Sequence, residues 1–156
     1  MQRIPWKEEL WIQHTRVILD AFTHWTGGEL CSRAGSAEDQ ARRLFEAPFI
    51  VVAHGTQNDP ILNYGNQAAL DLWELDLETF LKTPSRKTAE PMHRDERAKM
   101  LQQSHNHGYI SDYQGIRITS TGKRFYIRRA TVWSLKDSTN QPLGQAATFS
   151  EWEMLS

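Results

Sequence analysis

Polar side chains that could contact a small molecule gather between Thr83 and Arg97, in the segment TPSRKTAEPMHRDER. Pro84 and Pro91 interrupt this segment, so we expect a structured loop and not a long helix. Its hydroxyl, guanidinium and carboxylate groups could offer donors and an acceptor to a polar ligand. The alternative is structural: Arg86 pairs with Glu90, and the hydroxyls cap short helical turns. The candidate ligand contacts in this segment are Ser85, Arg86, Thr88 and Glu90.

Basic side chains are concentrated in a second stretch, the predicted hairpin of residues 109–136. Six basic residues there stand against only Asp112 and Asp137, a local excess of four positive charges. Because the planar guanidinium group matches a carboxylate or phosphate with two parallel hydrogen bonds, an acidic ligand or an acidic partner surface would fit. The alternative is a solvated sheet face whose charges answer acids in the N-terminal helices. We take Arg117 and Arg128 as candidate ligand contacts.

Histidine and catalytic motifs give no strong signal. His105 and His107 lie two residues apart near the end of a predicted helix, so they point in different directions, and positive charge there is stabilising without a metal. His54 ends a predicted strand, where we expect a turn residue and not a ligand. The chain has no G-x-S-x-G elbow, P-loop, H-E-x-x-H or dinucleotide fingerprint, and its carboxylates lack a paired spacing. We therefore expect neither a metal site nor an enzyme.

The elements that must position these residues follow from hydrophobic periodicity and turn signals. Residues 49–53 form an apolar, β-branched run, residues 61–64 form a second short strand, and Asn66 occupies the N-cap of a short helix. A further helix begins near Asp95 and ends at Gly108. Three long strands with bulges follow, at residues 109–119, 123–136 and 143–152. The sequence thus predicts an α+β fold with a five-stranded antiparallel sheet and helices on one face.

The chain before residue 48 is helical in character. One helix starts near Pro5 and ends at Gly27, and a second begins after the capping-box pair Ser36 and Asp39. We treat residues 1–47 as an N-terminal helical extension and residues 48–156 as the main domain. The first helix carries three of the six tryptophans. Its apolar face either packs on the sheet or contributes to a homodimer contact, because large aromatic residues are enriched at association surfaces.

Length and composition exclude several classes of protein. The 156 residues suffice for one domain with an appendage, and the net charge of -1 argues against a protein that coats nucleic acid or an anionic membrane. The single cysteine, Cys31, cannot form an internal disulfide, which fits a reducing cytoplasm. No apolar run approaches the roughly 20 residues of a membrane helix, and the N-terminus lacks the core of a signal peptide. We expect a cytoplasmic protein without membrane or nucleic-acid partners.

Four ordered stretches resemble the MEKHLA family: DPILNYGNQAALDLWEL, TPSRKTAEPMHRDER, GYISDYQGIRITSTGKRF and GQAATF. The order of two strands, a helix, a connecting segment, a helix and three antiparallel strands is also that of PAS domains. The MEKHLA family is a PAS-like module found in free-standing bacterial proteins and at the C-terminal end of plant class III homeodomain-leucine-zipper transcription factors. The resemblance covers roughly residues 49–152.

The resemblance implies a sensory or regulatory domain that binds a small molecule between sheet and helices and signals through a dimer or a partner protein. The alternative is a ligand-free interaction module whose interior is filled; an enzyme acting on a small acid is a third class. In PAS domains the stretch equivalent to residues 83–97 borders the ligand cleft. The core in the ligand-free alternative consists of Trp73, Phe80, Tyr109, Trp133 and Phe149.

No cofactor is identified by the sequence. The light-sensing flavin subclass of PAS domains needs a cysteine on the helical side of the pocket, whereas Cys31 falls in the linker between the two N-terminal helices. Gln145 lies on the last strand, where flavin-binding relatives often carry a glutamine, so it is a candidate ligand contact and keeps a non-covalent flavin open. Its alternative role is to satisfy a neighbouring turn.

Overall fold

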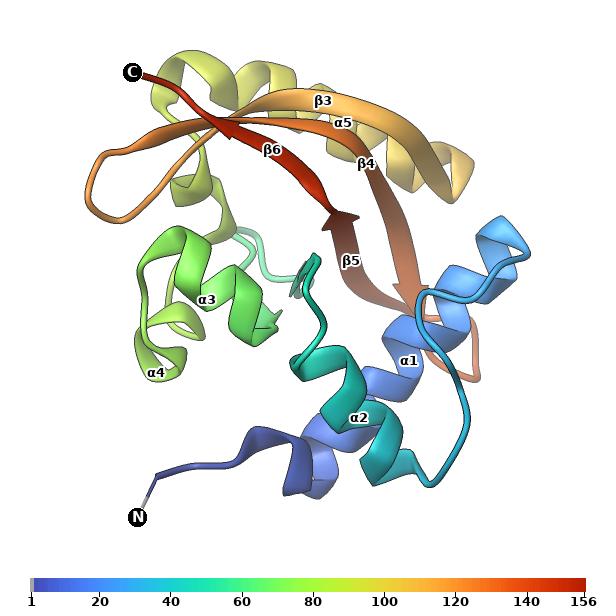
Figure 1. Cartoon of the computed structure of the whole chain (residues 1–156). Helices are drawn as coiled ribbons and strands as arrows, with labels where there is room; N and C mark the ends of the chain where they lie inside the picture. The colour runs from blue at the N-terminus through green and yellow to red at the C-terminus, as the bar shows by residue number, and fades with distance from the viewer. Residues whose placement is uncertain (1) are drawn as a thin grey trace.

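The computed structural model describes residues 2–156, in which helices precede the first two strands and separate them from the last four (Figure 1). Short 3-10 helices are written η. The elements in chain order are η1 (Pro5–Lys7), α1 (Glu9–Thr26), α2 (Ala37–Phe45), β1 (Ile50–His54), β2 (Leu62–Gly65), α3 (Gln67–Trp73), α4 (Leu77–Phe80), η2 (Ser85–Thr88), α5 (Pro91–His107), β3 (Tyr109–Ile118), β4 (Arg124–Lys136), β5 (Pro142–Phe149) and β6 (Glu151–Met154).

The strands form one antiparallel sheet in the order β2-β1-β5-β4-β3, which confirms the predicted α+β fold with five ordered strands. The register between β3 and β4 shifts on both sides of Tyr113, so the expected bulges are present. The last predicted strand is interrupted at Ser150, and the residues after it form the short β6, which pairs with β4. The side chains of β6 are exposed throughout.

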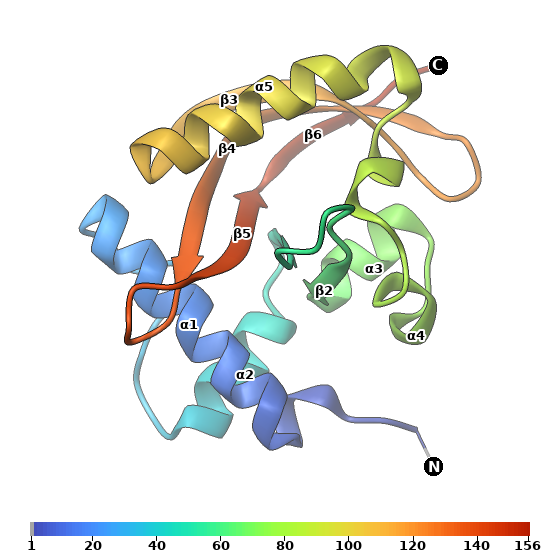
Figure 2. The ribbon, with the colours of Figure 1, turned by 180° about the vertical axis from the view of Figure 1, so that it is seen from behind.

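The two faces of the sheet pack against different helices. Val52, Ala147 and Val132 lie opposite one another on β1, β5 and β4, and they form the inner face, which α5 covers. The neighbouring row of Ala53, Ala146 and Trp133 belongs to the hydrophobic cluster that includes α1 and α2. Figures 1 and 2 show α5 running along β3 and β4, with α1 near the other end of β4.

The N-terminal helices pack on the sheet of their own chain. Trp11, Ile18 and Leu19 are buried on α1, and the Trp11 ring lies 4.7 Å from the Tyr64 ring between centroids. On the same face, the indole Nε1 of Trp133 donates a hydrogen bond of 3.2 Å to the carbonyl of Ile18. The prediction that the apolar face of the first helix packs on the sheet is confirmed, whereas the domain division at residue 47 stays a prediction.

Asn66 is the predicted N-cap of α3, and it also joins three segments of the chain. Its Oδ1 accepts hydrogen bonds from the amides of Ala69 (3.2 Å) and Val51 (3.1 Å). Its Nδ2 donates to the carbonyls of Phe49 (2.8 Å) and Leu44 (3.2 Å). The side chain is fully buried, so this single amide ties the start of α3 to β1 and to the last residues of α2.

The long helix α5 begins at Pro91, four residues before the predicted start at Asp95. The segment is not one long helix, as expected, but Pro91 begins a helix and residues 91–97 are not a loop, because proline is favoured in the first helical turn, where its missing N–H would have no partner. The segment from Thr83 to Arg97 is therefore divided between η2 and the first turns of α5. Of its 17 residues, α5 buries only Met100 and Ser104.

Candidate functional site

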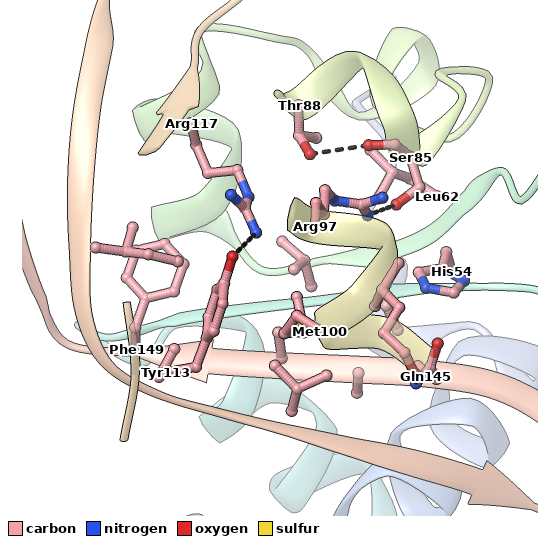
Figure 3. A pocket seen from close by; sticks show the side chains of 18 of the residues that line it. His54, Leu62, Ser85, Thr88, Arg97, Met100, Tyr113, Arg117, Gln145 and Phe149 are labelled. Carbon is pink, nitrogen blue, oxygen red and sulfur yellow. Dashed lines mark hydrogen bonds between the residues drawn. The ribbon is translucent and has the colours of Figure 1, made fainter. Parts of the chain in front are cut away.

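An internal cavity of about 60 Å³ lies between the inner face of the sheet and α5 (Figure 3). Apolar side chains from strands and helix make most of its wall, including Val52, Met100, Ile127 and Val132. Polar side chains enter from five elements: β1, η2, α5, β3 and β5. Because burying a polar group is unfavourable unless it is hydrogen-bonded, the partners of these polar groups indicate what the cavity could hold.

Two arginines border the cavity near β3. Arg117 is only 5% exposed, and it donates to the Tyr113 hydroxyl (2.9 Å) and to the carbonyl of Ile116 (2.8 Å). Arg97, from α5, donates to the hydroxyl of Ser85 on η2. Burial, together with the nearby positive charge of Arg117, lowers the pKa of Arg97 to about 10. The charge of Arg117 thus adds to burial in disfavouring the charged form of Arg97.

His54 and Gln145 line the cavity from paired positions on β1 and β5. His54 is 8% exposed, its Nδ1 lies 3.0 Å from the carbonyl oxygen of Gly55, and its Nε2 has no hydrogen-bond partner within residues 2–156. Burial lowers the pKa of His54, which favours the neutral ring. With Nδ1–H donating to that carbonyl, Nε2 is an acceptor. Gln145 donates through Nε2 to the carbonyl of Leu101 (2.9 Å), which leaves its side-chain oxygen as a further acceptor.

The structure brings four of the predicted site residues to the cavity and leaves three outside it. Ser85, Thr88, Arg117 and Gln145 line the cavity. The other three have partners of opposite charge, Arg86 and Arg128 on the surface and Glu90 half-buried: Arg86 pairs with Asp59 (3.2 Å), Glu90 with Arg124 (2.6 Å) and Arg128 with Glu153 (3.0 Å). The alternative pairing of Arg86 with Glu90 was wrong, because each has a different partner brought close by the fold. The Thr88 hydroxyl donates to the carbonyl of Ser85 (2.8 Å), as expected of a short helical turn.

Three cavity-lining polar residues were missed from the sequence: His54, Arg97 and Tyr113. A signal existed for Arg97, because Arg97, Met100, Leu101 and Ser104 share one face of the helix that was predicted from Asp95. The alternation of strand residues could have placed Tyr113 on the same face as Arg117. The same period of two places His54 on the same face of the sheet as Val52. His54 therefore lines the cavity, and the prediction of a turn residue there missed this role.

The described residues offer no group of three or more histidine, cysteine or acidic side chains that could hold a metal ion. Cys31 packs against the hydrophobic cluster of α1 and α2, on the opposite side of the sheet from the cavity. A cavity of about 60 Å³ is far smaller than the roughly 300–1,000 Å³ of typical cofactor and drug-sized ligand sites, so a flavin does not fit between these side chains as they stand. Within residues 2–156, no helix has the length and apolar character needed to cross a membrane.

Solved structures place this arrangement of sheet and helices among PAS-like domains. A PAS domain of a protein from Colwellia psychrerythraea is similar with a TM-score of 0.63 at 13% identity, over 76% of this chain and 95% of that one. A light-oxygen-voltage domain studied with a flavin analogue gives 0.59 at 15% identity, over 76% and 85% of the two chains. An RNA-binding light-oxygen-voltage receptor gives 0.59 at 14% identity, over 81% of this chain and 34% of that one. At these identities the likeness shows the fold alone.

The chain belongs to the MEKHLA domain family, whose model matches residues 12–154. The match begins within α1, well before the roughly residue 49 at which the resemblance noted in the sequence starts. A search of curated proteins found no match. The predicted family and fold are therefore confirmed. The family and the fold do not state which molecule, if any, the cavity binds.

Proposed function

We propose that this chain is a cytoplasmic sensory or regulatory module that binds a small molecule between the sheet and α5 and passes the signal on through a dimer or a partner protein. The observation that carries the proposal is the meeting of polar side chains from five elements at one internal cavity. Most of these groups have partners in the protein, but Nε2 of His54 has none within residues 2–156 and the guanidinium groups have N–H donors to spare; a bound molecule would supply partners for these groups. In this proposal the chain has no catalytic activity.

A surface groove next to the cavity supports access for a ligand. The groove has a volume of about 600 Å³ and shares Leu62, Trp73 and Thr88 with the lining of the cavity. Beyond these shared residues it is bordered by the starts of α5 and by the end of β3, including Pro91 and Ile118. A small displacement of η2 would therefore widen the opening between the cavity and this groove. The same displacement would move the start of α5, which gives a ligand a mechanical route to the protein surface.

Native mass spectrometry and thermal unfolding test this proposal on the full chain. We expect either a co-purified small molecule in the native mass or a rise of the unfolding midpoint with at least one member of a metabolite panel. Ala147→Leu would fill the cavity from β5 and should remove that response. Ala98→Leu, an exposed position on α5, is the matched control and should keep it. A polypeptide-only mass with no thermal response would reject ligand binding.

The small cavity volume favours a second candidate, a ligand-free interaction module. A volume of about 60 Å³ leaves room for only a few water molecules. In that case the inner face is a core with residual space, and the relevant readout is association. Light scattering of the full chain over a range of concentrations would support this candidate if it showed a dimer whose mass and stability do not respond to any small molecule.

A further inference from the structure

The cavity has an electrostatic imbalance where α5 meets β3. Arg97 and Arg117 both line it, and neither takes part in any ion pair formed within residues 2–156. A buried charge without a counter-charge is unfavourable until something neutralises it. We infer that the cavity binds the carboxylate group of a short-chain organic acid between these two guanidinium groups. This inference rests on the proposed function and specifies its ligand class.

The two guanidinium groups keep most of their donors for such a ligand. Each carries five N–H groups, and three hydrogen bonds to the protein are formed by the pair, to Ser85, Ile116 and Tyr113. The other N–H groups have no acceptor within residues 2–156. A carboxylate has two oxygens with about four acceptor sites in the plane that a guanidinium fork presents, so it can use donors from both arginines.

Glu96 is the carboxylate connected to this pair, but it compensates the charge only in part. It lies on the exposed side of α5 and accepts a hydrogen bond of 2.9 Å from the Tyr113 hydroxyl. Glu96 thus reaches Arg117 only through the hydroxyl of Tyr113. Its negative charge raises the pKa of Arg97, but burial and the charge of Arg117 lower that pKa by more. Tyr113 therefore holds Arg117 in place beside the cavity while the cavity itself stays positive.

The volume and the remaining lining restrict the acid to a short chain. One water-sized probe occupies about 10–15 Å³, so about 60 Å³ accommodates roughly four to six non-hydrogen atoms. Val52, Met100 and Val132 would contact a methyl or methylene group. The free Nε2 of His54, which also lines the cavity, would accept a hydrogen bond from a hydroxyl group. Acetate, propionate and lactate are acids of this size.

Thermal unfolding of the full chain separates carboxylate recognition from general effects of salt. The ligands are acetate, propionate and lactate; the neutral comparisons are propionamide and 1-propanol; inorganic phosphate and sodium chloride are added at matched ionic strength. We expect a rise in the midpoint of about 5–10 °C at an acid concentration 100 times its Kd, with no comparable rise for the neutral compounds, phosphate or chloride. In ¹⁵N spectra, the side-chain Nε–H signals of Arg97 and Arg117 should shift with the same acid.

Variants of the two arginines distinguish a binding role from a structural one. Arg97→Gln and Arg117→Gln should each weaken the acid at least tenfold, whereas Arg128→Gln on the surface of β4 should leave it unchanged. Without acid, Arg97→Gln should unfold at the same temperature as the unaltered chain or higher, because the repulsion with Arg117 is gone. If that variant does not fold, Arg97→Lys, which keeps the charge and loses the planar fork, should fold and still bind at least tenfold more weakly.

Different outcomes would overturn the carboxylate inference and the proposed function. Stabilisation by a neutral compound and not by the acids overturns the carboxylate assignment and leaves a small-molecule module in place. A response to phosphate alone also overturns it, because the anion would be tetrahedral. No response to any of these compounds overturns the carboxylate inference, whereas the proposed function is rejected only if the native mass is that of the polypeptide alone and the metabolite panel also gives no response. Equal acid binding by Arg97→Lys and the unaltered chain shows that the fork of Arg97 does not hold the carboxylate.

Discussion

Replacing Asn66 with alanine is the strongest test of how this fold is assembled. The substitution removes four hydrogen bonds and leaves the amides of Val51 and Ala69 without their acceptor at a fully buried position. A buried donor left unsatisfied costs about 1–3 kcal/mol. The carbonyls of Leu44 and Phe49 lose one donor each, which costs less because a carbonyl oxygen has a second acceptor site. We expect a loss of about 3–5 kcal/mol in the free energy of unfolding, the sum of two unsatisfied donors with partial relaxation.

Urea denaturation with a parallel thermal scan measures this loss. At about 2–4 °C per kcal/mol for a chain of this size, the midpoint should fall by roughly 6–20 °C. The control is Asp76→Ala, which removes an exposed N-cap of α4 that accepts one hydrogen bond, from the Thr79 amide at 2.7 Å. That variant should cost about 0.5–2 kcal/mol. If Asn66→Ala costs no more than Asp76→Ala, the reasoning that one amide joins three segments is refuted.

Three further predictions concern Gly144 near the start of β5, the pH dependence and the N-terminal helix. Gly144→Ala should destabilise the chain by more than about 3 kcal/mol in urea, because φ there is +129° and an added Cβ would lie 1.8 Å from the His54 carbonyl oxygen; an unchanged midpoint would contradict this. Burial depresses the pKa of His54 below its unfolded value of about 6.5, so the unfolded chain binds more protons and the free energy of unfolding should fall as pH drops below about 6.5. His54→Gln should make the free energy of unfolding depend less on pH in this range. An unaltered pH dependence in that variant would contradict the prediction. Deleting residues 2–35 exposes the surface that α1 covers around Trp133, at a cost of about 1.5–3 kcal/mol for each large apolar side chain uncovered. The near-ultraviolet circular dichroism of the shortened chain should therefore show no fixed tertiary structure. A cooperative thermal transition of the shortened chain would refute this prediction.

Helix caps and turns predicted most of the element boundaries, because each of these motifs is formed by residues that are close together in the sequence. The N-cap at Asn66, the capping box of Ser36 and Asp39 and the left-handed turn at Gly27 are all formed as expected. The start of α5 was missed because a proline such as Pro91 can either end a helix or stand in its first turn. The sequence around Pro91 does not decide between these two roles, and the fold does.

The candidate site was harder to predict because it depends on which polar residues the fold buries. Arg86 and Arg117 are both predicted ligand contacts, yet the first pairs with Asp59 on the surface and the second is buried beside Tyr113. Asp59 is 27 residues away from Arg86 in the chain, and no local pattern announces such a partner. Arg97 lies within the predicted helix, on the same face as Met100 and Ser104, but the sequence alone does not tell which face of that helix the sheet covers.

The sparse burial of α5 has a consequence for motion. Over 17 residues it buries two side chains, whereas α1 buries four over 18. Its attachment to the sheet instead uses polar contacts: Ser104 donates to the carbonyl of Val132, and the carbonyl of Leu101 accepts from Gln145. Segments with few buried apolar contacts open locally at a lower free energy than the rest of a protein. The wall of the cavity is thus a helix that can detach and return while α1 and the sheet behind it remain folded.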